Sequence, residues 1–254
     1  MKGKIVFITG ATSGFGAACA RRYAREGAAG LVLLGRRTER LVALEKELDL
    51  PVHTIAVDVR DRAALVAKIE ALPAPFAEVD ILINNAGLAR GLDKAYEADL
   101  DDWDVMVDTN IKGLLYTTRA VLPGMVERGR GHVVNLGSVA GSYAYPGGNV
   151  YGASKAFVNL FSLELRADLF GKGVRVTSIE PGLCETDFST TRFGGDAERA
   201  AAVYKGANAL TAEDIAESIF WATALPAHYN INRIEMMPVS QSFAPLTILR
   251  DEAT

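Results

Sequence analysis

Residues 5–16 read Ile-Val-Phe-Ile-Thr-Gly-Ala-Thr-Ser-Gly-Phe-Gly, an apolar run that leads into a glycine-rich segment. The run predicts a buried strand, and the periodicity of residues 15–26 predicts a helix directly after it. Gly10, Gly14 and Gly16 then lie in the connecting turn, where glycine permits a close backbone approach. Such a turn before a helix N-terminus is typical of a phosphate-binding site, although a tight turn without any ligand has the same local pattern.

Apolar runs of strand length alternate with amphipathic segments along the rest of the chain. Together they predict an α/β, Rossmann-type, doubly wound domain with a seven-stranded parallel sheet. The runs are almost continuously hydrophobic, which indicates helices on both faces of the sheet. The predicted strands are 5–9, 31–34, 52–57, 81–83, 133–136, 174–179 and 231–237, and the predicted helices are 15–26, 37–48, 62–71, 100–107, 111–127, 150–170 and 212–224.

The length of 254 residues with 49% hydrophobic composition allows one large core, so we expect a single domain over residues 1–254. Residues 183–210 are rich in Gly, Ser and Thr, and we expect them to be irregular and to form a lid. Residues 238–254 are expected to be a C-terminal tail that folds over the site. Thr211 followed by Asp214 resembles a weak capping box for the last helix.

The net charge is −4, from 27 basic and 31 acidic residues without long blocks of one sign. This balance gives no basis for binding nucleic acid or an anionic membrane. The N-terminus lacks the apolar core of a signal peptide, and no run approaches the roughly 18 apolar residues of a membrane span, so a cytoplasmic protein is expected. Cys19 and Cys184 are expected to be reduced thiols, and the spacing of His53, His132 and His228 gives no metal site.

Arg36 and Arg37 follow the second predicted strand, where an enzyme that uses NAD usually has an acidic residue. A guanidinium there favours the 2′-phosphate of NADP, to which it can donate charge-assisted hydrogen bonds. The two arginines would also be explained if they only solvated the start of the next helix.

Polar residues also follow the third and fourth predicted strands, at the edge where doubly wound sheets bind ligands. Asp58 ends the third strand, and the sequence Asn84-Asn85-Ala86-Gly87 ends the fourth. Both are well placed for an adenine and a ribose. Alternatively, Asp58 caps the helix that begins near Asp61, and the asparagines stabilise a turn.

The motifs T-G-x-x-x-G-x-G, N-N-A-G, Asn110, Ser138, Y-x-x-x-K and Pro181-Gly182 occur in this order along the chain. In this respect the whole chain resembles the short-chain dehydrogenases/reductases. The segments 118–128, 140–152, 225–232 and 235–242 are similar to those of the bacterial NADP-dependent 3-hydroxy acid dehydrogenases, which include malonic semialdehyde reductases. Sulfoacetaldehyde reductases share the same segments, so the two groups are poorly separated by inspection.

The resemblance implies a catalytic tetrad of Asn110, Ser138, Tyr151 and Lys155. Tyr151 would donate the proton in carbonyl reduction, and Lys155 one turn along the same helix would lower the pKa of the phenol from about 10. Ser138 would hydrogen-bond the substrate oxygen, and Asn110 would hold a water that links Lys155 to solvent. Without the other motifs, Ser138 would be a turn or cap serine and Asn110 a buried hydrogen-bonding residue.

The resemblance also implies an NADP(H) site. Thr186 is expected at the nicotinamide carboxamide. Its loop is one residue shorter than the loop expected in the most similar relatives, and a surface turn remains the alternative. The expected cofactor-binding residues are Gly10, Thr12, Ser13, Gly14, Phe15, Gly16, Arg36, Arg37, Asp58, Val59, Asn85, Ala86, Gly87, Tyr151, Lys155, Pro181, Gly182, Leu183 and Thr186.

A cation in the expected lid, Arg192, is a candidate clamp for a substrate carboxylate or sulfonate. Tyr145 and Gln241 can add hydrogen bonds, beside Ser138 and Tyr151 at the reacting group. Arg192 as a solvated loop residue and Tyr145 as a packing residue are the alternatives.

The expected activity is the NADP(H)-dependent interconversion of a short anionic aldehyde or 3-oxo acid and its alcohol. Malonic semialdehyde with 3-hydroxypropionate and serine-type 3-hydroxy acids are the first substrates, and sulfoacetaldehyde with isethionate is the alternative. A non-catalytic NADP-binding regulator is the alternative from another class. The resemblance also implies a homotetramer, paired through the segments 111–128 and 150–170 with a second contact through the C-terminal region. The alternative is that the apolar stripes of these segments serve only the core.

Overall fold

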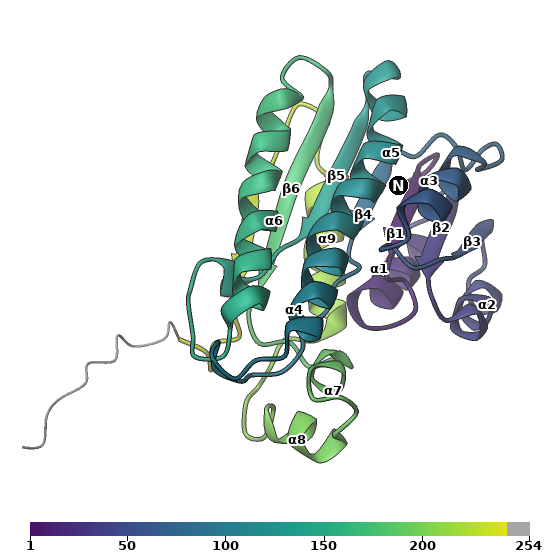
Figure 1. The fold of residues 1–254 in the computed structure, drawn as a ribbon. Helices are drawn as coiled ribbons and strands as arrows, with labels where there is room; N and C mark the ends of the chain where they lie inside the picture. The colour runs from purple at the N-terminus through teal and green to yellow at the C-terminus, as the bar shows by residue number, and fades with distance from the viewer. Residues whose placement is uncertain (243–254) are drawn as a thin grey trace, which may run out of the picture.

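The computed structural model describes residues 1–242 of the chain, so residues 243–254 of the expected tail lie outside the described residues. Within the described part, seven parallel strands form one sheet in the order β3-β2-β1-β4-β5-β6-β7 (Figure 1). The predicted α/β fold with a seven-stranded parallel sheet is confirmed. The strands are β1 Ile5–Thr9, β2 Gly30–Gly35, β3 Val52–Ala56, β4 Ile81–Asn84, β5 Gly131–Leu136, β6 Val174–Pro181 and β7 Arg233–Met236.

Helices connect the strands and cover both faces of the sheet. The predicted helix over residues 111–127 begins three residues later as regular α-helix, because a π-helix, η1 (Asp108–Gly113), precedes it. A 3-10 turn, η2 (Val139–Gly141), follows β5. The α-helices are α1 Gly14–Arg25, α2 Thr38–Glu47, α3 Arg62–Glu70, α4 Leu100–Val107, α5 Leu114–Glu127, α6 Asn149–Asp168, α7 Phe188–Arg192, α8 Ala197–Ala202 and α9 Ala212–Ala224.

The side chains of β1 alternate between two hydrophobic layers, as successive residues of a strand must. Val6 and Ile8 pack with residues of α1, α2 and α9, whereas Ile5 and Phe7 pack with residues of α3, α5 and α6. Figure 1 shows these two groups of helices around the sheet. The central strands are therefore buried on both faces, which explains their continuous hydrophobicity.

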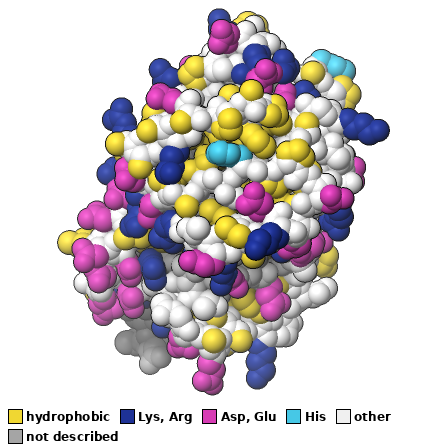
Figure 2. Space-filling view, turned by 90° about the vertical axis from the view of Figure 1, so that its right-hand side faces the viewer, with side chains coloured by type: hydrophobic (Ala, Val, Ile, Leu, Met, Phe, Trp, Pro, Cys, Tyr) yellow, Lys and Arg dark blue, Asp and Glu magenta, His cyan; other side chains and the backbone are white. Residues whose placement is uncertain are grey.

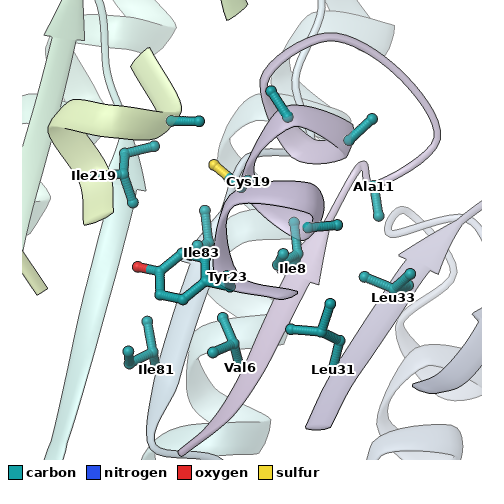
Figure 3. Packing of buried hydrophobic residues seen from close by; sticks show 14 of the residues in the cluster. Val6, Ile8, Ala11, Cys19, Tyr23, Leu31, Leu33, Ile81, Ile83 and Ile219 are labelled. Atoms are coloured by element: carbon teal, nitrogen blue, oxygen red, sulfur yellow. The ribbon is translucent and has the colours of Figure 1, made fainter. Parts of the chain in front are cut away.

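The layer around α1 contains two residues with polar atoms. Cys19 lies fully buried between α1 and the sheet, close to Ile83 and Ile219 in Figure 3. Tyr23 is also fully buried, and its hydroxyl is 2.6 Å from the hydroxyl of Thr223 on α9. Both cysteines are free thiols, as their spacing indicated.

The segment 183–210 was expected to be irregular, and this expectation was wrong: α7 and α8 lie within it, at one end of the sheet (Figure 1). Residues 197–202 read Ala-Glu-Arg-Ala-Ala-Ala, a strongly helix-forming sequence. The Asp196 side chain caps this helix by accepting a hydrogen bond from the Arg199 N–H. Gly194 and Gly195 have positive φ angles and separate the two helices. The local signals for α8 were thus present in the sequence.

The expected cap of the last helix has the full reciprocal geometry. The Thr211 hydroxyl accepts from the Asp214 N–H, and the Asp214 carboxylate accepts from the Thr211 N–H at 2.8 Å. This arrangement is the capping box that the sequence resembled, and it fixes the residue at which α9 begins.

The surface carries charges of both signs. Figure 2 looks onto the side of the molecule with α2, α3 and β3, and there the positive and negative side chains are intermixed. Among the described residues, no helix has both the length and the apolar character needed to cross a membrane.

Asp80 joins three strands at the end of the sheet opposite the glycine turn. Its carboxylate accepts from the Ile5 N–H at 3.0 Å, from Lys4 Nζ at 3.1 Å and from Arg130 Nε at 3.0 Å, and the residue is only 4% exposed. Burial raises the pKa of Asp80, but these three donors outweigh it and hold the pKa below its usual value of 3.8.

We expect Asp80→Asn to lower the free energy of unfolding by about 1–3 kcal/mol at pH 7, because the buried Ile5 N–H and the half-exposed Lys4 and Arg130 lose a charged acceptor. The folded-state pKa is depressed, so this contribution of Asp80 is present above pH 3.8 and is lost as the pH falls below it. Urea denaturation of both proteins at pH 7 and at lower pH values measures the difference. A gap that stays constant through the acid range would contradict this assignment.

Candidate active site

A cavity of about 620 Å³ opens at the carboxyl ends of the strands, where β1 and β4 lie at the switch point of the sheet order. Of the residues expected to bind cofactor or substrate or to catalyse, all but Gly16 and Asn110 line this cavity. The elements that contribute are the turn after β1, the ends of β2 to β6, α6 and the segment with α7. The sequence motifs therefore converge on one site.

The glycine turn is packed too tightly for other residues. Gly10 and Gly14 have φ angles of +65° and +50°, in the left-handed region that favours glycine. A Cβ at Gly16 would overlap the carbonyl oxygen of Gly10. The Ser13 side chain does not cap α1, so the first N–H groups of this helix point toward the cavity edge without that partner. The turn is thus a backbone cradle suited to phosphate.

Asn85 fastens this turn to the end of β4. Its Nδ2 donates to the carbonyls of Thr9 at 2.9 Å and Gly10 at 3.1 Å, and the Thr9 hydroxyl accepts from the N–H groups of Asn85 and Ala86. The alternative for the asparagine pair, stabilisation of a turn, holds for Asn85. Asn84 instead lies buried in β4 and donates to Thr118 and Asn135. Gly87 and Ala86 form the cavity wall next to this clamp.

Arg37 lies over the glycine turn, where its Nη2 donates to the hydroxyls of Thr12 and Ser13, both at 2.8 Å. Arg36 is exposed, and its Nη1 lies 3.6 Å from the carboxylate of Asp58. Both guanidinium groups thus line the cavity at the ends of β2 and β3, and Phe15 lines it beside them. Solvation of the helix start alone does not explain the contacts of Arg37.

Asp58 is held mainly by a neighbour that the sequence gave no reason to single out. Arg60 Nη2 donates to its carboxylate at 2.7 Å, and the Arg60 N–H donates at 3.0 Å. Burial raises the pKa of Asp58, but Arg60 outweighs it and keeps the pKa below its usual value. The helix after β3 is capped by Asp61 rather than Asp58, so the alternative of a capping role for Asp58 was wrong. Val59 packs against Gly113.

Tyr151 and Lys155 lie on consecutive turns of α6 and face the cavity. Lys155 Nζ donates to the Leu136 carbonyl at 2.7 Å, and burial lowers the Lys155 pKa to about 8. Burial raises the pKa of Tyr151 to about 12, although the Ser138 hydroxyl and the charge of Arg192 both lower it. The expected lowering by Lys155 is not found among these effects: Nζ lies 5.9 Å from the phenol ring centre. Desolvation therefore dominates in the protein alone.

Ser138 and Asn110 both have the structural roles that were the alternatives, a cap serine and a buried hydrogen-bonding residue. Ser138 caps η2 by accepting from the Ala140 N–H at 3.1 Å, and its hydroxyl also donates to the Pro181 carbonyl at 3.3 Å at the cavity wall. Asn110 is buried in η1, where it accepts from the Leu88 N–H at 2.9 Å and donates to Ser154. π-Helical turns are frequent at functional sites, and this one turns Asn110 toward α6.

The loop after β6 closes one wall. Gly182 and Leu183 contact Gln241: the Leu183 N–H donates to Gln241 Oε1 at 2.7 Å. The Thr186 hydroxyl accepts from the Phe188 N–H, and its side chain lies next to Gly14, so it is part of the cavity rather than of a surface turn. Gln241 thus lies in the cavity wall with its side-chain oxygen already engaged.

Arg192 projects from α7 toward the catalytic helix. Its Nη2 donates to the Tyr145 hydroxyl at 3.0 Å, and its guanidinium lies 4.9 Å from the ring centre of Tyr151. The Arg192 Nε is buried without a hydrogen-bond partner. A solvated loop position and a purely packing role for Tyr145 are both contradicted by these contacts. A cation with an unused donor is therefore held beside the phenol ring of Tyr151.

Several cavity residues were not anticipated. Phe188 packs against Tyr151 with ring centres 5.5 Å apart, and Tyr204 and Ser189 form a hydroxyl pair at 2.6 Å. The Gly91 N–H donates to the Arg192 carbonyl, so the loop after β4 holds α7 in place. These residues carry no motif, and only the tertiary position of α7 and α8 brings them to the site.

Comparisons with known proteins agree with this arrangement. Residues 4–196 match the family described as short chain dehydrogenase. The chain is 57% identical over 247 residues to an NADP-dependent 3-hydroxy acid dehydrogenase of Salmonella typhi, with 97% of this chain and 99% of that protein covered. It is 54% identical over 246 residues to a serine 3-dehydrogenase of Agrobacterium fabrum, with 97% and 98% covered.

Solved structures show the same relationship. The closed form of a serine dehydrogenase complexed with NADP+ superposes with a TM-score of 0.95 at 54% identity, over 97% of this chain and all of that chain. The serine dehydrogenase from Escherichia coli has a TM-score of 0.83 at 51% identity, over 94% of this chain and all of that chain. From its cavity, its motifs and these relatives, the chain belongs to the short-chain dehydrogenase/reductase family.

Proposed function

We propose that this protein is an NADP(H)-dependent oxidoreductase that interconverts a short 3-hydroxy acid and the corresponding 3-oxo acid. The observation that carries the proposal is the position of Arg192, whose buried Nε has no partner and whose guanidinium faces the ring of Tyr151. Tyr151 as proton donor and Arg192 as anion-binding cation would then both contact one small substrate in the cavity. The names of the relatives, a 3-hydroxy acid dehydrogenase and serine 3-dehydrogenases, support the same substrate class.

The cofactor is NADP(H), and the chain's own residues fit it. The glycine turn leaves room that a Cβ would fill, and the uncapped N-terminus of α1 suits a pyrophosphate. Arg36 and Arg37, which directly follow β2, suit the 2′-phosphate. When bound, NADPH supplies hydride to the carbonyl carbon, and its oxidised form places a positive charge on the nicotinamide.

Tyr151 holds the proton that the carbonyl oxygen needs. With a pKa raised to about 12 by burial, the phenol stays protonated at neutral pH, the state required for carbonyl reduction. Ser138 can hydrogen-bond the same oxygen as it gains charge. For alcohol oxidation, the phenol must instead lose its proton, which the nearby charge of Arg192 favours.

The Arg192 guanidinium is proposed to bind the carboxylate of the substrate, with Tyr145 holding the guanidinium in place. A carboxylate offers two acceptor oxygens, so the free Nε and an Nη group can donate to it together. A sulfonate has the same charge and similar acceptors, so sulfoacetaldehyde reduction is kept as the alternative activity. A non-catalytic NADP-binding regulator would have no use for the four catalytic residues together.

A homotetramer is also proposed. The helix α6 exposes Leu160 by 58% and Leu163 by 36%, while Phe157 and Phe161 stack beside them with ring centres 5.7 Å apart. Apolar side chains on a helix face are what a pairing surface between copies would bury. Light scattering of the purified protein distinguishes a tetramer from a monomer.

We expect Tyr151→Phe to lower kcat for aldehyde reduction by about 100-fold or more, because the proton donor is removed while the ring remains. NADPH binding, followed by the fluorescence of the cofactor, is expected to remain within about threefold of the wild type. Wild-type turnover in the variant would show that Tyr151 is not the acid.

We expect Arg37→Ala to lower kcat/KM for NADPH by about 10- to 100-fold and to leave that for NADH nearly unchanged, because NADH lacks the 2′-phosphate. Steady-state assays with both cofactors measure the ratio. Arg25→Ala, an exposed change on α1 outside the cavity, is the matched control. Equal losses for both cofactors would argue against phosphate recognition by Arg37.

We expect Arg192→Ala to raise KM for malonic semialdehyde and sulfoacetaldehyde by about 10- to 100-fold, with a much smaller effect on propanal. The control is Arg199→Ala, which changes an exposed lid arginine that does not line the cavity. The ratio of kcat/KM between the two anionic aldehydes also ranks carboxylate against sulfonate. If neutral and anionic aldehydes lose equally, the clamp is refuted.

A further inference from the structure

Ser138 and Tyr151 must act on one substrate oxygen, yet they lie on different elements. Ser138 follows β5, and Tyr151 lies on α6. Catalytic groups have to be held to within a fraction of an ångström, so some contact must fix these two elements to each other. Lys155 provides one such contact through its bond to the Leu136 carbonyl at 2.7 Å.

Asn159 provides a second contact, one helical turn after Lys155 and on the same face of α6. Its Nδ2 donates to the carbonyl of Ser138 at 3.2 Å, and the residue is 7% exposed. The Ser138 carbonyl can only accept, so the amide nitrogen must face it. Asn159 is therefore bonded to the backbone of the serine itself.

The loop is shaped to receive this carboxamide. A Cβ at Gly137 would overlap Asn159 Oδ1, and a Cβ at Gly141 would lie 2.7 Å from Nδ2 and 2.7 Å from the Ala156 nitrogen. Because Gly137 and Gly141 lack side chains, the loop that contains Ser138 can pack directly against Asn159 and α6. This packing leaves the serine little freedom to move relative to the helix.

Hydrogen-bond satisfaction alone does not account for Asn159. The Ser138 carbonyl already accepts from the Gly141 N–H at 3.0 Å, and Asn159 Oδ1 is buried without a partner. A buried unpaired amide oxygen lowers stability, whereas an apolar side chain of similar shape has no such penalty. The presence of Asn159 is thus better explained by its hydrogen bond to the Ser138 backbone, which holds Ser138 against α6.

We propose that Asn159 is a positioning residue that sets Ser138 relative to Tyr151 for transfer of the proton to the carbonyl oxygen. The inference rests on the proposed function and assigns to it a residue that touches neither substrate nor cofactor. Asn159 acts through the Ser138 backbone, so its effect depends on the Ser138 hydroxyl being present.

The test is a double-mutant cycle with wild type, Asn159→Leu, Ser138→Ala and the double variant, assayed for NADPH-dependent reduction of malonic semialdehyde. We expect Asn159→Leu to lower kcat about 10-fold, with NADPH affinity and the unfolding temperature little changed. In the Ser138→Ala background, the same change is expected to lower kcat no further. Asn159→Ala has a smaller side chain than Leu and cannot clash with Gly137. It is also expected to lower kcat about 10-fold in the wild-type background and no further in the Ser138→Ala background.

Ser162→Ala is the matched control, because Ser162 is buried on the next turn of α6 and bonds Asn135 rather than the serine loop. It is expected to lower the unfolding temperature and to leave kcat unchanged. Normal turnover in both Asn159 variants, or losses that multiply in the double variant, would overturn the inference alone. A wild-type protein that reduces no aldehyde would overturn the proposed function and the inference with it.

Discussion

The clamp between Asn85 and the backbone of Thr9 and Gly10 is the contact on which the site depends. It joins the ends of β1 and β4, the neighbouring strands from which the chain continues to opposite sides of the sheet. The clamp holds the carbonyls of the turn, and the Ser13 side chain does not cap α1, so the start of this helix lies at the cavity without a side-chain partner. The same contact leaves no room for a Cβ at Gly10 or Gly16. A single contact, from Asn85 to the turn, thus relates the order of the strands, the need for glycine in the turn and the shape of the cofactor site.

Burial sets the second condition for the chemistry. Tyr151 and Lys155 are both drawn toward their neutral forms, with pKa values near 12 and 8, because the cavity wall removes them from water. The same dehydration strengthens every charge that enters the cavity. In the protein alone, burial thus affects the phenol more than Lys155 does.

Much of this arrangement could be predicted from the sequence, because strands buried on both faces and glycine-rich turns leave strong local patterns. The predicted strands are within two residues of the observed ends, and every expected cavity residue except Gly16 and Asn110 lines the cavity. The helices α7 and α8 are short, and the Gly, Ser and Thr residues around them obscured the helix-forming run of residues 197–202. Arg60 is only two residues from Asp58, but its type alone did not indicate the contact. The bond from Asn159 to the Ser138 carbonyl depends on two elements meeting in space, which no spacing along the chain encodes.

Two buried polar atoms lack hydrogen-bond partners near the cavity: Arg192 Nε beside the Tyr151 ring, and Asn159 Oδ1 on the side chain that bonds Ser138. An unpaired buried donor lowers the stability of the free protein, and an acceptor that reaches it removes that penalty. An anionic substrate can do so at Arg192, whereas a neutral aldehyde leaves the guanidinium dehydrated and unsatisfied. Discrimination of this kind exceeds what shape alone can give, because the wrong substrate forfeits a hydrogen bond that the site has already dehydrated. The selectivity of the site for acids would then arise because the free protein carries an unpaired buried donor that only an anionic substrate satisfies. This donor lies next to Tyr151, where the substrate carbonyl must be aligned.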